Sequence, residues 1–295
     1  MPKNIYTMSI VWVYLCKKRV FFSSNNHYKL SIIMSTPLAK IIKKTYQNQS
    51  LYYSIFRELA WCSSLSIAMI SQDGTIQKIC FFETKEVVDQ YPNWHTGPEL
   101  PMFVQNMLGY QFFSNLIIQG SCAPMIAIEI YAEGQRIGFP GIPFHIIAQL
   151  VHSIRLESAL LSWHKDNSQG SLGVFHALQQ HSSIPLSLVP IGMYDLGSAD
   201  TIMPILLKIP KFMEDGVVAC IAFTAQDRRL HATPKLEQNI RLGYSIAQMS
   251  LSGTELIQQF NQQRQLHQVC DGILWNPFTP AEFFLPWTEF LSWNS

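Results

Sequence analysis

The stretch at residues 124–165, PMIAIEIYAEGQRIGFPGIPFHIIAQLVHSIRLESALLSWHK, decides the fold. Apolar and β-branched residues flank Glu133-Gly134, and glycine tolerates the positive φ that a tight turn requires. This pattern predicts a β-hairpin of strands 125–131 and 135–139. After Pro143 the apolar residues recur at helical spacing, which predicts an amphipathic helix. A hairpin followed by such a helix is a complete unit from which a core can grow.

A second hairpin is predicted upstream, where Asp73-Gly74 joins apolar strands at 65–70 and 76–82. Helical patterns surround it. They cover residues 41–60 with a break near Asn48-Gln49-Ser50, residues 84–90, and residues 102–118, the last helical to Gly109 or on to Asn115. Alternating helices and hairpins predict an α+β fold, in which helices pack on an antiparallel or mixed sheet.

The second half repeats this mixture of elements. Apolar strands are predicted at 186–194, 217–224 and 244–251, and helices at 201–213 and 254–266. The polar segment 166–173 contains two glycines and is the best candidate for a boundary. We therefore expect an α+β half at 34–165 and a second at 174–295, which can also form one continuous domain.

Residues 1–33 differ from the rest of the chain. The apolar run at 9–16 has about eight residues, whereas a helix needs about 20 to span a bilayer. One interpretation is a signal anchor. The other, which we prefer, is that translation begins at Met34, so that residues 1–33 are disordered or absent from the native protein.

The charge content limits the classes of partner. Charged residues make up 14% of the 295 residues and the net charge is +1, whereas about 25% is usual. Either neutral polar side chains cover the surface, or a partner covers part of it, because interface cores are poor in charge. A chain without a basic stripe also lacks the electrostatic attraction on which nucleic-acid binding depends.

Neither the cysteines nor the histidines predict a metal site or a cofactor. The six cysteines include no C-x-x-C pair, so they indicate reduced thiols in the cytoplasm rather than a zinc site or a disulfide framework. His145, His152 and Glu157 are seven and five residues apart on the predicted helix, and His176 and His181 are five apart. Metal-binding histidines on one helical face are normally three or four residues apart.

The C-terminal segment is rich in aromatic residues. Thr279-Pro280-Ala281-Glu282 matches a capping box with proline at the first helical position, which predicts a helix at 280–292. Its apolar face either packs on the protein's own sheet or anchors a partner, since Trp and Phe contribute much of the binding energy at interfaces. The partner-binding candidates are Phe283, Phe284, Trp287, Phe290 and Trp293.

One segment resembles a catalytic motif. His267-Gln268-Val269-Cys270-Asp271-Gly272 resembles the His-x-x-x-Asp-Gly motif of the chloramphenicol acetyltransferase and acyl-carrier acyltransferase superfamily, and it lies near the C-terminus as it does there. The resemblance implies that His267 deprotonates an acyl acceptor while Asp271 fixes the local structure, and a neutral imidazole suits such chemistry near pH 7. The structural alternative is the last turn of a helix, with Gly272 as its cap.

The leading hypothesis is a cytoplasmic, non-catalytic interaction subunit with protein partners or further copies of itself, no nucleic acid and no integral membrane span. The composition, rich in Gln, Asn, Ser, His and Ile, is similar to that of proteins from intracellular bacteria. Together with the length, it resembles accessory subunits of the type IVB (Dot/Icm) secretion coupling complex. That resemblance implies a role in recruiting effector proteins, with peripheral attachment to the membrane through the complex. The alternatives are an acyltransferase using His267 and an injected effector.

Overall fold

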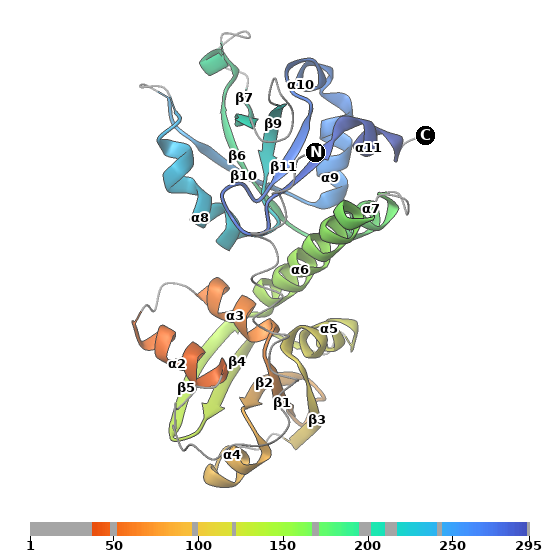
Figure 1. Cartoon of the computed structure of the whole chain (residues 1–295). Coiled ribbons are helices and arrows are strands. Elements are labelled where there is room, and N and C mark those ends of the chain that lie inside the picture. Colours follow the sequence, from red (N-terminus) through yellow and green to blue (C-terminus); the bar gives the residue numbers. More distant parts are fainter. Residues whose placement is uncertain are drawn as a thin grey trace, which may run out of the picture.

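The hairpin and helix predicted at 124–165 are present in the computed structural model. β4 (Cys122–Ala132) and β5 (Gln135–Pro143) pair antiparallel around Gly134, whose φ is +65°. α6 (Phe144–Lys165) follows directly and runs between two lobes, one built from the N-terminal half and one from the C-terminal half (Figure 1). The structure describes residues 37–47, 52–95, 100–119, 122–166, 171–194, 202–209, 217–240 and 244–293. The predictions for residues 1–33 lie outside these ranges.

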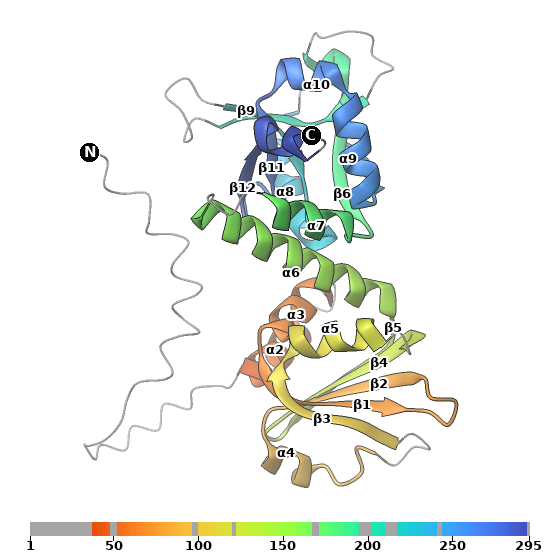
Figure 2. The same cartoon turned by 90° about the vertical axis from the view of Figure 1, so that its right-hand side faces the viewer.

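The N-terminal lobe is built on a five-stranded sheet in the order β3-β1-β2-β4-β5. β1 (Ser63–Ile70) and β2 (Ile76–Phe82) form the predicted Asp-Gly hairpin, and β2 pairs with β4 in parallel. α2 (Pro37–Gln47), α3 (Tyr52–Ala60) and α5 (Gly109–Gln119) cover the face nearer α6, whereas α4 (Lys85–Gln90) lies on the opposite side (Figure 2).

The prediction of a helix beginning at residue 102 was wrong. Residues 100–108 form β3 (Leu100–Leu108), which pairs antiparallel with β1, and only α5 after it is helical. A short continuous apolar run has no period that separates a buried strand from a buried helix. The pairing with β1 decides the outcome. Gly109 is needed at the turn between them, because a Cβ there would lie 2.4 Å from the carbonyl oxygen of Leu59.

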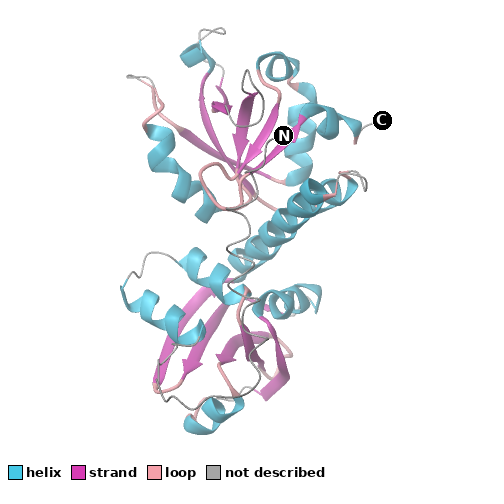
Figure 3. Ribbon diagram, viewed as in Figure 1, coloured by secondary structure: helices cyan, strands magenta, loops and turns pink. Residues whose placement is uncertain are grey.

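The C-terminal lobe has helices on both faces of its strands (Figure 3). α8 (Gln226–Glu237) lies on one face, and α7 (Leu172–Gln179), α9 (Gly253–Gln262), α10 (Arg264–Val269) and α11 (Trp287–Ser292) lie on the other. A short 3-10 helix, η2 (Ile191–Tyr194), follows β6. The strands are β6 (Ile184–Pro190), β7 (Ile202–Pro204), β8 (Leu206–Ile209), β9 (Val217–Ala222), β10 (Ala247–Leu251), β11 (Gly272–Trp275) and β12 (Phe283–Pro286).

These strands form two hydrogen-bonded groups, β10-β6-β7 and β12-β11-β9-β8. Backbone bonds from Ile205 to Ser187 and from Ile221 to Ile205 connect the two groups. β9 and β11 run parallel, so their carboxyl ends meet at one edge. That edge faces α6 and positions the polar site described below.

Two helices predicted in this half are replaced by strands, the first throughout its described part and the second over part of its length. Within residues 201–213, the described part forms β7 and β8, which pair with β6 and β9. Residues 280–292 are not one helix, because Phe283 to Pro286 form β12 against β11 and α11 begins only at Trp287. Thr279 accepts a hydrogen bond from the amide of Ala281, and Glu282 accepts one from Phe278. The residues of the apparent capping box thus stabilise a turn.

α6 contributes to the cores of both lobes. Its side chains up to Ile154 pack with the helices and sheet of the N-terminal lobe, and those from Leu156 onward pack with the C-terminal lobe. The α+β fold class predicted from the sequence is confirmed, with mixed sheets in both lobes. Each helix in the described ranges is too short or too polar to cross a lipid bilayer.

Candidate functional site

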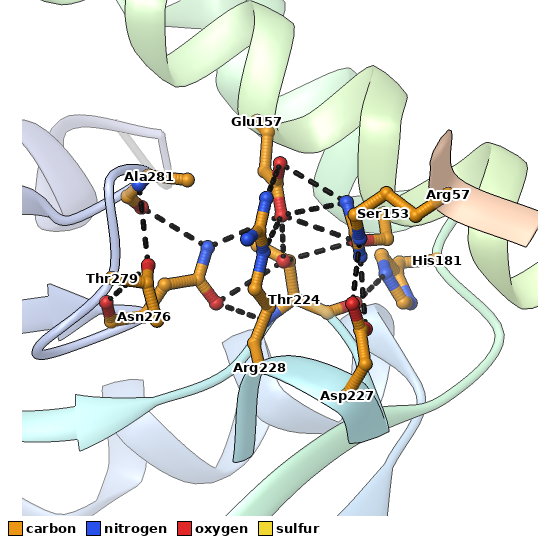
Figure 4. A network of polar contacts seen from close by, with 10 residues as sticks. All are labelled: Arg57, Ser153, Glu157, His181, Thr224, Asp227, Arg228, Asn276, Thr279 and Ala281. Carbon is orange, nitrogen blue, oxygen red and sulfur yellow. Dashed lines mark hydrogen bonds and ion pairs between the residues drawn. The ribbon is translucent and has the colours of Figure 1, made fainter. Parts of the chain in front are cut away.

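A cluster of polar side chains lies where α6 crosses the carboxyl ends of β9 and β11 (Figure 4). We call it the junction network. It joins α3 of the N-terminal lobe to α6 and to α8 of the C-terminal lobe. Its members are Arg57, Ser153, Glu157, His181, Thr224, Asp227, Arg228 and Asn276.

Glu157 is the centre of the junction network. Its carboxylate accepts two hydrogen bonds from Arg228, at 2.9 and 2.8 Å, and further bonds from Arg57 Nη1 at 3.2 Å to each oxygen. The Thr224 hydroxyl donates to the same carboxylate at 2.6 Å. Burial raises the pKa of Glu157, but the charges of Arg57 and Arg228 outweigh it and the net shift is downward. Glu157 is therefore ionised, and it is unsuited to act as a general acid near neutral pH.

Arg57 connects the two lobes directly. Its guanidinium binds Asp227 through Nε at 2.7 Å and Nη2 at 3.0 Å, and Nη2 also donates to the Ser153 hydroxyl at 3.0 Å. Only 8% of its side chain is exposed. Burial lowers the pKa of Arg57, but Glu157 and Asp227 raise it further, so the guanidinium stays charged. Such a planar, multiply bonded arginine fixes the orientation of both carboxylates.

The carboxyl ends of β9 and β11 position Thr224, Asp227 and Asn276. Asn276 follows β11 with a positive φ of 50°, a conformation that asparagine tolerates better than most residues. Its side-chain oxygen accepts the backbone N–H of Thr224 at 2.9 Å. α8 begins two residues after Thr224, and Asp227 in its first turn suits the positive end of the helix dipole. Local geometry thus presents Thr224, Asp227 and Asn276 to α6.

His181 completes the junction network from the segment between α7 and β6. Nε2 lies 2.8 Å from the carbonyl oxygen of Thr224, and the backbone N–H of Ser183 donates to Nδ1 at 3.3 Å. Burial and the neighbouring His152 lower the pKa of His181 to about 4. The ring is therefore neutral at physiological pH, with Nε2 as the donor.

The junction network acts as a clamp, that is, its ion pairs hold the two lobes together. Two guanidinium groups face two carboxylates, and each charge is bonded to an opposite charge. Neither carboxylate is left to bind a cation, and in the ranges that the structure describes no three His, Cys, Asp or Glu side chains are placed to hold a metal ion.

The network was not predicted from the sequence. From the sequence, Glu157 was considered only as a possible metal ligand together with His145 and His152. His181 was considered only together with His176. The structure instead places His152 beside His181, with ring centroids 5.9 Å apart. The charged partners of Glu157, Arg57 and Arg228, lie 100 and 71 residues from it in the chain, and no local pattern indicates such pairs.

His267 and Asp271, the residues of the acyltransferase resemblance, have different surroundings in the structure. The His267 ring lies 4.7 Å from that of Trp287, and its buried Nε2 has no hydrogen-bond partner among the described residues. The Asp271 carboxylate accepts the backbone N–H of Val218 at 3.0 Å. A Cβ at residue 272 would lie 2.3 Å from the carbonyl oxygen of Leu285. Asp271 and Gly272 therefore serve the pairing of β11 with its two neighbours.

The five aromatic candidates for partner binding have different environments. Trp287 and Phe290 are buried in the core of the C-terminal lobe, where Trp287 Nε1 donates to the carbonyl oxygen of Cys270 at 2.7 Å. Phe283 and Phe284 are half-buried and pack on opposite faces of the sheet. Trp293 is half-buried at the surface. For Trp287 and Phe290, the interpretation as part of the protein's own core is the one that the burial supports.

Comparison with models of known protein families, with curated proteins and with solved structures finds no match to this chain. The function proposed below is therefore inferred from the geometry of the molecule itself.

Four apolar residues that are half-buried or exposed lie at or near the contact between α11 and α7, and we call them the apolar corner: Leu172, Phe175, Leu291 and Trp293. Leu172 and Leu291 expose 57% and 39% of their surface, and the half-buried ring of Phe175 lies 5.3 Å from that of Trp293. A hydrogen bond of 2.7 Å from Trp293 Nε1 to Ser171 Oγ joins α11 to the start of α7. A shallow groove of about 530 Å³ adjoins it. The groove is lined by Thr254, Ile257, Gln258, Asn261, Gln262 and Leu291.

Proposed function

We propose that this chain is a non-catalytic protein–protein interaction subunit that binds its partner through the apolar corner. The observation that carries the proposal is the exposure of Leu172 and Leu291 near the contact between Trp293 and Ser171, where Leu291 also lines the groove. Exposed apolar groups that gather around a hollow with a polar rim are typical of binding surfaces. The uncharged rim residues fit a partner segment that presents apolar side chains and neutral polar groups.

The polar chemistry of the molecule supports a binding role over an enzymatic one. The junction network neutralises its own charges, and Glu157 is held ionised within it. The acyltransferase alternative lacks comparable support, because the His267 ring packs against Trp287 and its Nε2 is buried.

A more specific version of the proposal can be stated. The chain would be a cytoplasmic accessory subunit of a bacterial type IVB secretion coupling complex, present as a homo-oligomer or bound to other subunits. Its role would be to help present effector proteins. This form rests on the resemblance in composition and length alone. The apolar corner is compatible with it, since accessory subunits act by holding other proteins.

Site-specific photo-crosslinking in native cells tests the proposed surface. Benzoylphenylalanine at position 172 or 291 of the full chain should yield a discrete heavier adduct, because both positions lie on the apolar corner. The matched control is position 230 on α8, which is 51% exposed on the other face of the lobe. Leu172→Asp and Leu291→Asp should weaken partner binding at least tenfold, or about 1.4 kcal/mol, and Leu230→Asp should not. Adducts at position 230 alone, or none, would refute the assignment.

A further inference from the structure

β10 is an outer strand, and neither its unpaired edge nor most of its side chains are covered by other described parts of the chain. It pairs antiparallel with β6, from Ala247 opposite Leu188 to Leu251 opposite Ile184. In the described part of the chain no strand pairs with its other edge. Four of its five side chains are exposed, all except Leu251. A strand exposed on both faces and along one edge offers unpaired backbone groups to another strand.

The other outer strands carry residues that discourage such pairing. Proline cannot donate a ladder hydrogen bond, and lysine at an edge repels or blocks an incoming strand. β10, by contrast, contains no proline, no glycine and no charged residue. The discouraging residues are Pro101 in β3, Pro140 and Pro143 in β5, and Pro286 in β12.

The sequence of β10 is complementary to itself. Its side chains alternate between an apolar face, Ala247, Met249 and Leu251, and a polar face, Gln248 and Ser250. A two-fold axis at Met249 would place Met249 opposite its own copy and Ala247 opposite Leu251 of the other chain. On the other face Gln248 would lie opposite Ser250. Apolar groups thus meet apolar groups, polar groups meet polar groups, and no like charges meet.

We infer that two copies of this chain pair antiparallel through β10 and join the β10-β6-β7 groups of both copies into one continuous sheet. The inference deepens the homo-oligomer form of the proposed function and rests on it. The low overall charge favours it, because a net charge of +1 gives little repulsion between copies. A pair of five-residue strands buries less than a standard interface, so we expect dissociation in roughly the micromolar range.

Sedimentation velocity on the purified full chain tests the pairing. The wild-type protein should change from monomer to dimer between roughly 1 and 100 µM, the range in which small interfaces dissociate. Met249→Lys and Met249→Glu should each remain monomeric, because each places like charges opposite one another at the two-fold axis. An equimolar mixture of the two variants should form a heterodimer, since the introduced ammonium group then faces the introduced carboxylate. Recovery on mixing also shows that both variants are folded.

The controls separate this inference from the proposed function. Ile118→Lys adds the same charge at a side chain that is 77% exposed on α5, and it should dimerise like the wild type. The Leu172→Asp and Leu291→Asp double variant should also dimerise, although it loses the partner at the apolar corner. A wild-type protein that stays monomeric, or a dimer that survives Met249→Lys, overturns the pairing through β10. So does binding of a foreign peptide that protects the β10 amides of a monomer.

Discussion

At the scale of single residues, His181 shows how burial sets the chemistry of a side chain. Its ring lies under α6 with both nitrogens bonded to the backbone, and its pKa is lowered to about 4 by burial and by His152. An unfolded chain would have a histidine pKa near about 6.5. The unfolded state therefore binds more protons than the folded state between these two pH values, and stability must fall as the pH falls through them.

We expect the free energy of unfolding to drop by about 2 kcal/mol between pH 7 and pH 5 because of His181. In His181→Gln, an amide that does not titrate can still donate to Thr224, so this part of the pH dependence should disappear. Urea denaturation at both pH values measures the difference. His164→Gln, at an exposed position on α6, is the control and should keep the wild-type slope. An unchanged slope in His181→Gln would show that His181 is not held neutral.

The members of the junction network illustrate the limit of prediction from sequence at this scale. The sequence shows that Glu157 lies on a helix, and that helix is confirmed as α6. It does not show that Arg57, 100 residues earlier, reaches the same carboxylate. Pairing of this kind depends on the relative position of two lobes, which is determined by packing and not by neighbouring residues.

At the scale of elements, local chemistry was predictable and remote pairing was not. The turns at Asp73-Gly74 and Glu133-Gly134 were predicted because the residues that form them are adjacent in sequence, and both glycines have positive φ. β3, β7 with β8, and β12 were predicted as helices. Each is a short apolar segment whose state depends on a partner strand, as with β12 against β11.

Gly272 offers a test of how tightly β11 and β12 pack. Gly272→Ala should destabilise the protein by about 1–3 kcal/mol, because its Cβ would lie 2.3 Å from a backbone oxygen of β12 that cannot move without breaking the ladder. Gly173→Ala on α7 is the matched control. No atom lies within 4 Å of a Cβ there, so it should stabilise by about 0.5–1 kcal/mol. Thermal and urea unfolding measure both, and equal effects would contradict the close approach.

At the scale of the whole molecule, the junction network determines how the lobes are held together. Each lobe has its own apolar core, and α6 runs through both. Arg57 is the side chain of the N-terminal lobe that bonds Asp227 of the C-terminal lobe. Breaking a buried ion pair by removing one partner costs about 3–5 kcal/mol, because the remaining charges stay buried.

Arg57→Ala should therefore loosen the junction more than it loosens either lobe. We expect faster hydrogen exchange in α3 and in the first turn of α8, with little change in β1 and β2. The control is Lys44→Ala, which removes an ion pair with Glu58 in which the lysine side chain is 59% exposed and which contributes less than about 1 kcal/mol. Uniform loss of protection across both lobes would show that the lobes do not depend on this clamp for their arrangement.

The chain separation within the clamp has a consequence for synthesis. Glu157 and Asp227 follow Arg57 by 100 and 170 residues, so the ribosome makes the two carboxylates at different times. At about 5–20 residues per second, roughly 4–14 s pass between them. The N-terminal core needs only residues up to Ile154, and it can form while Arg57 still lacks Asp227. Closure of this clamp is therefore among the last events in the maturation of the nascent chain, and a truncated product would leave the arginine open to solvent.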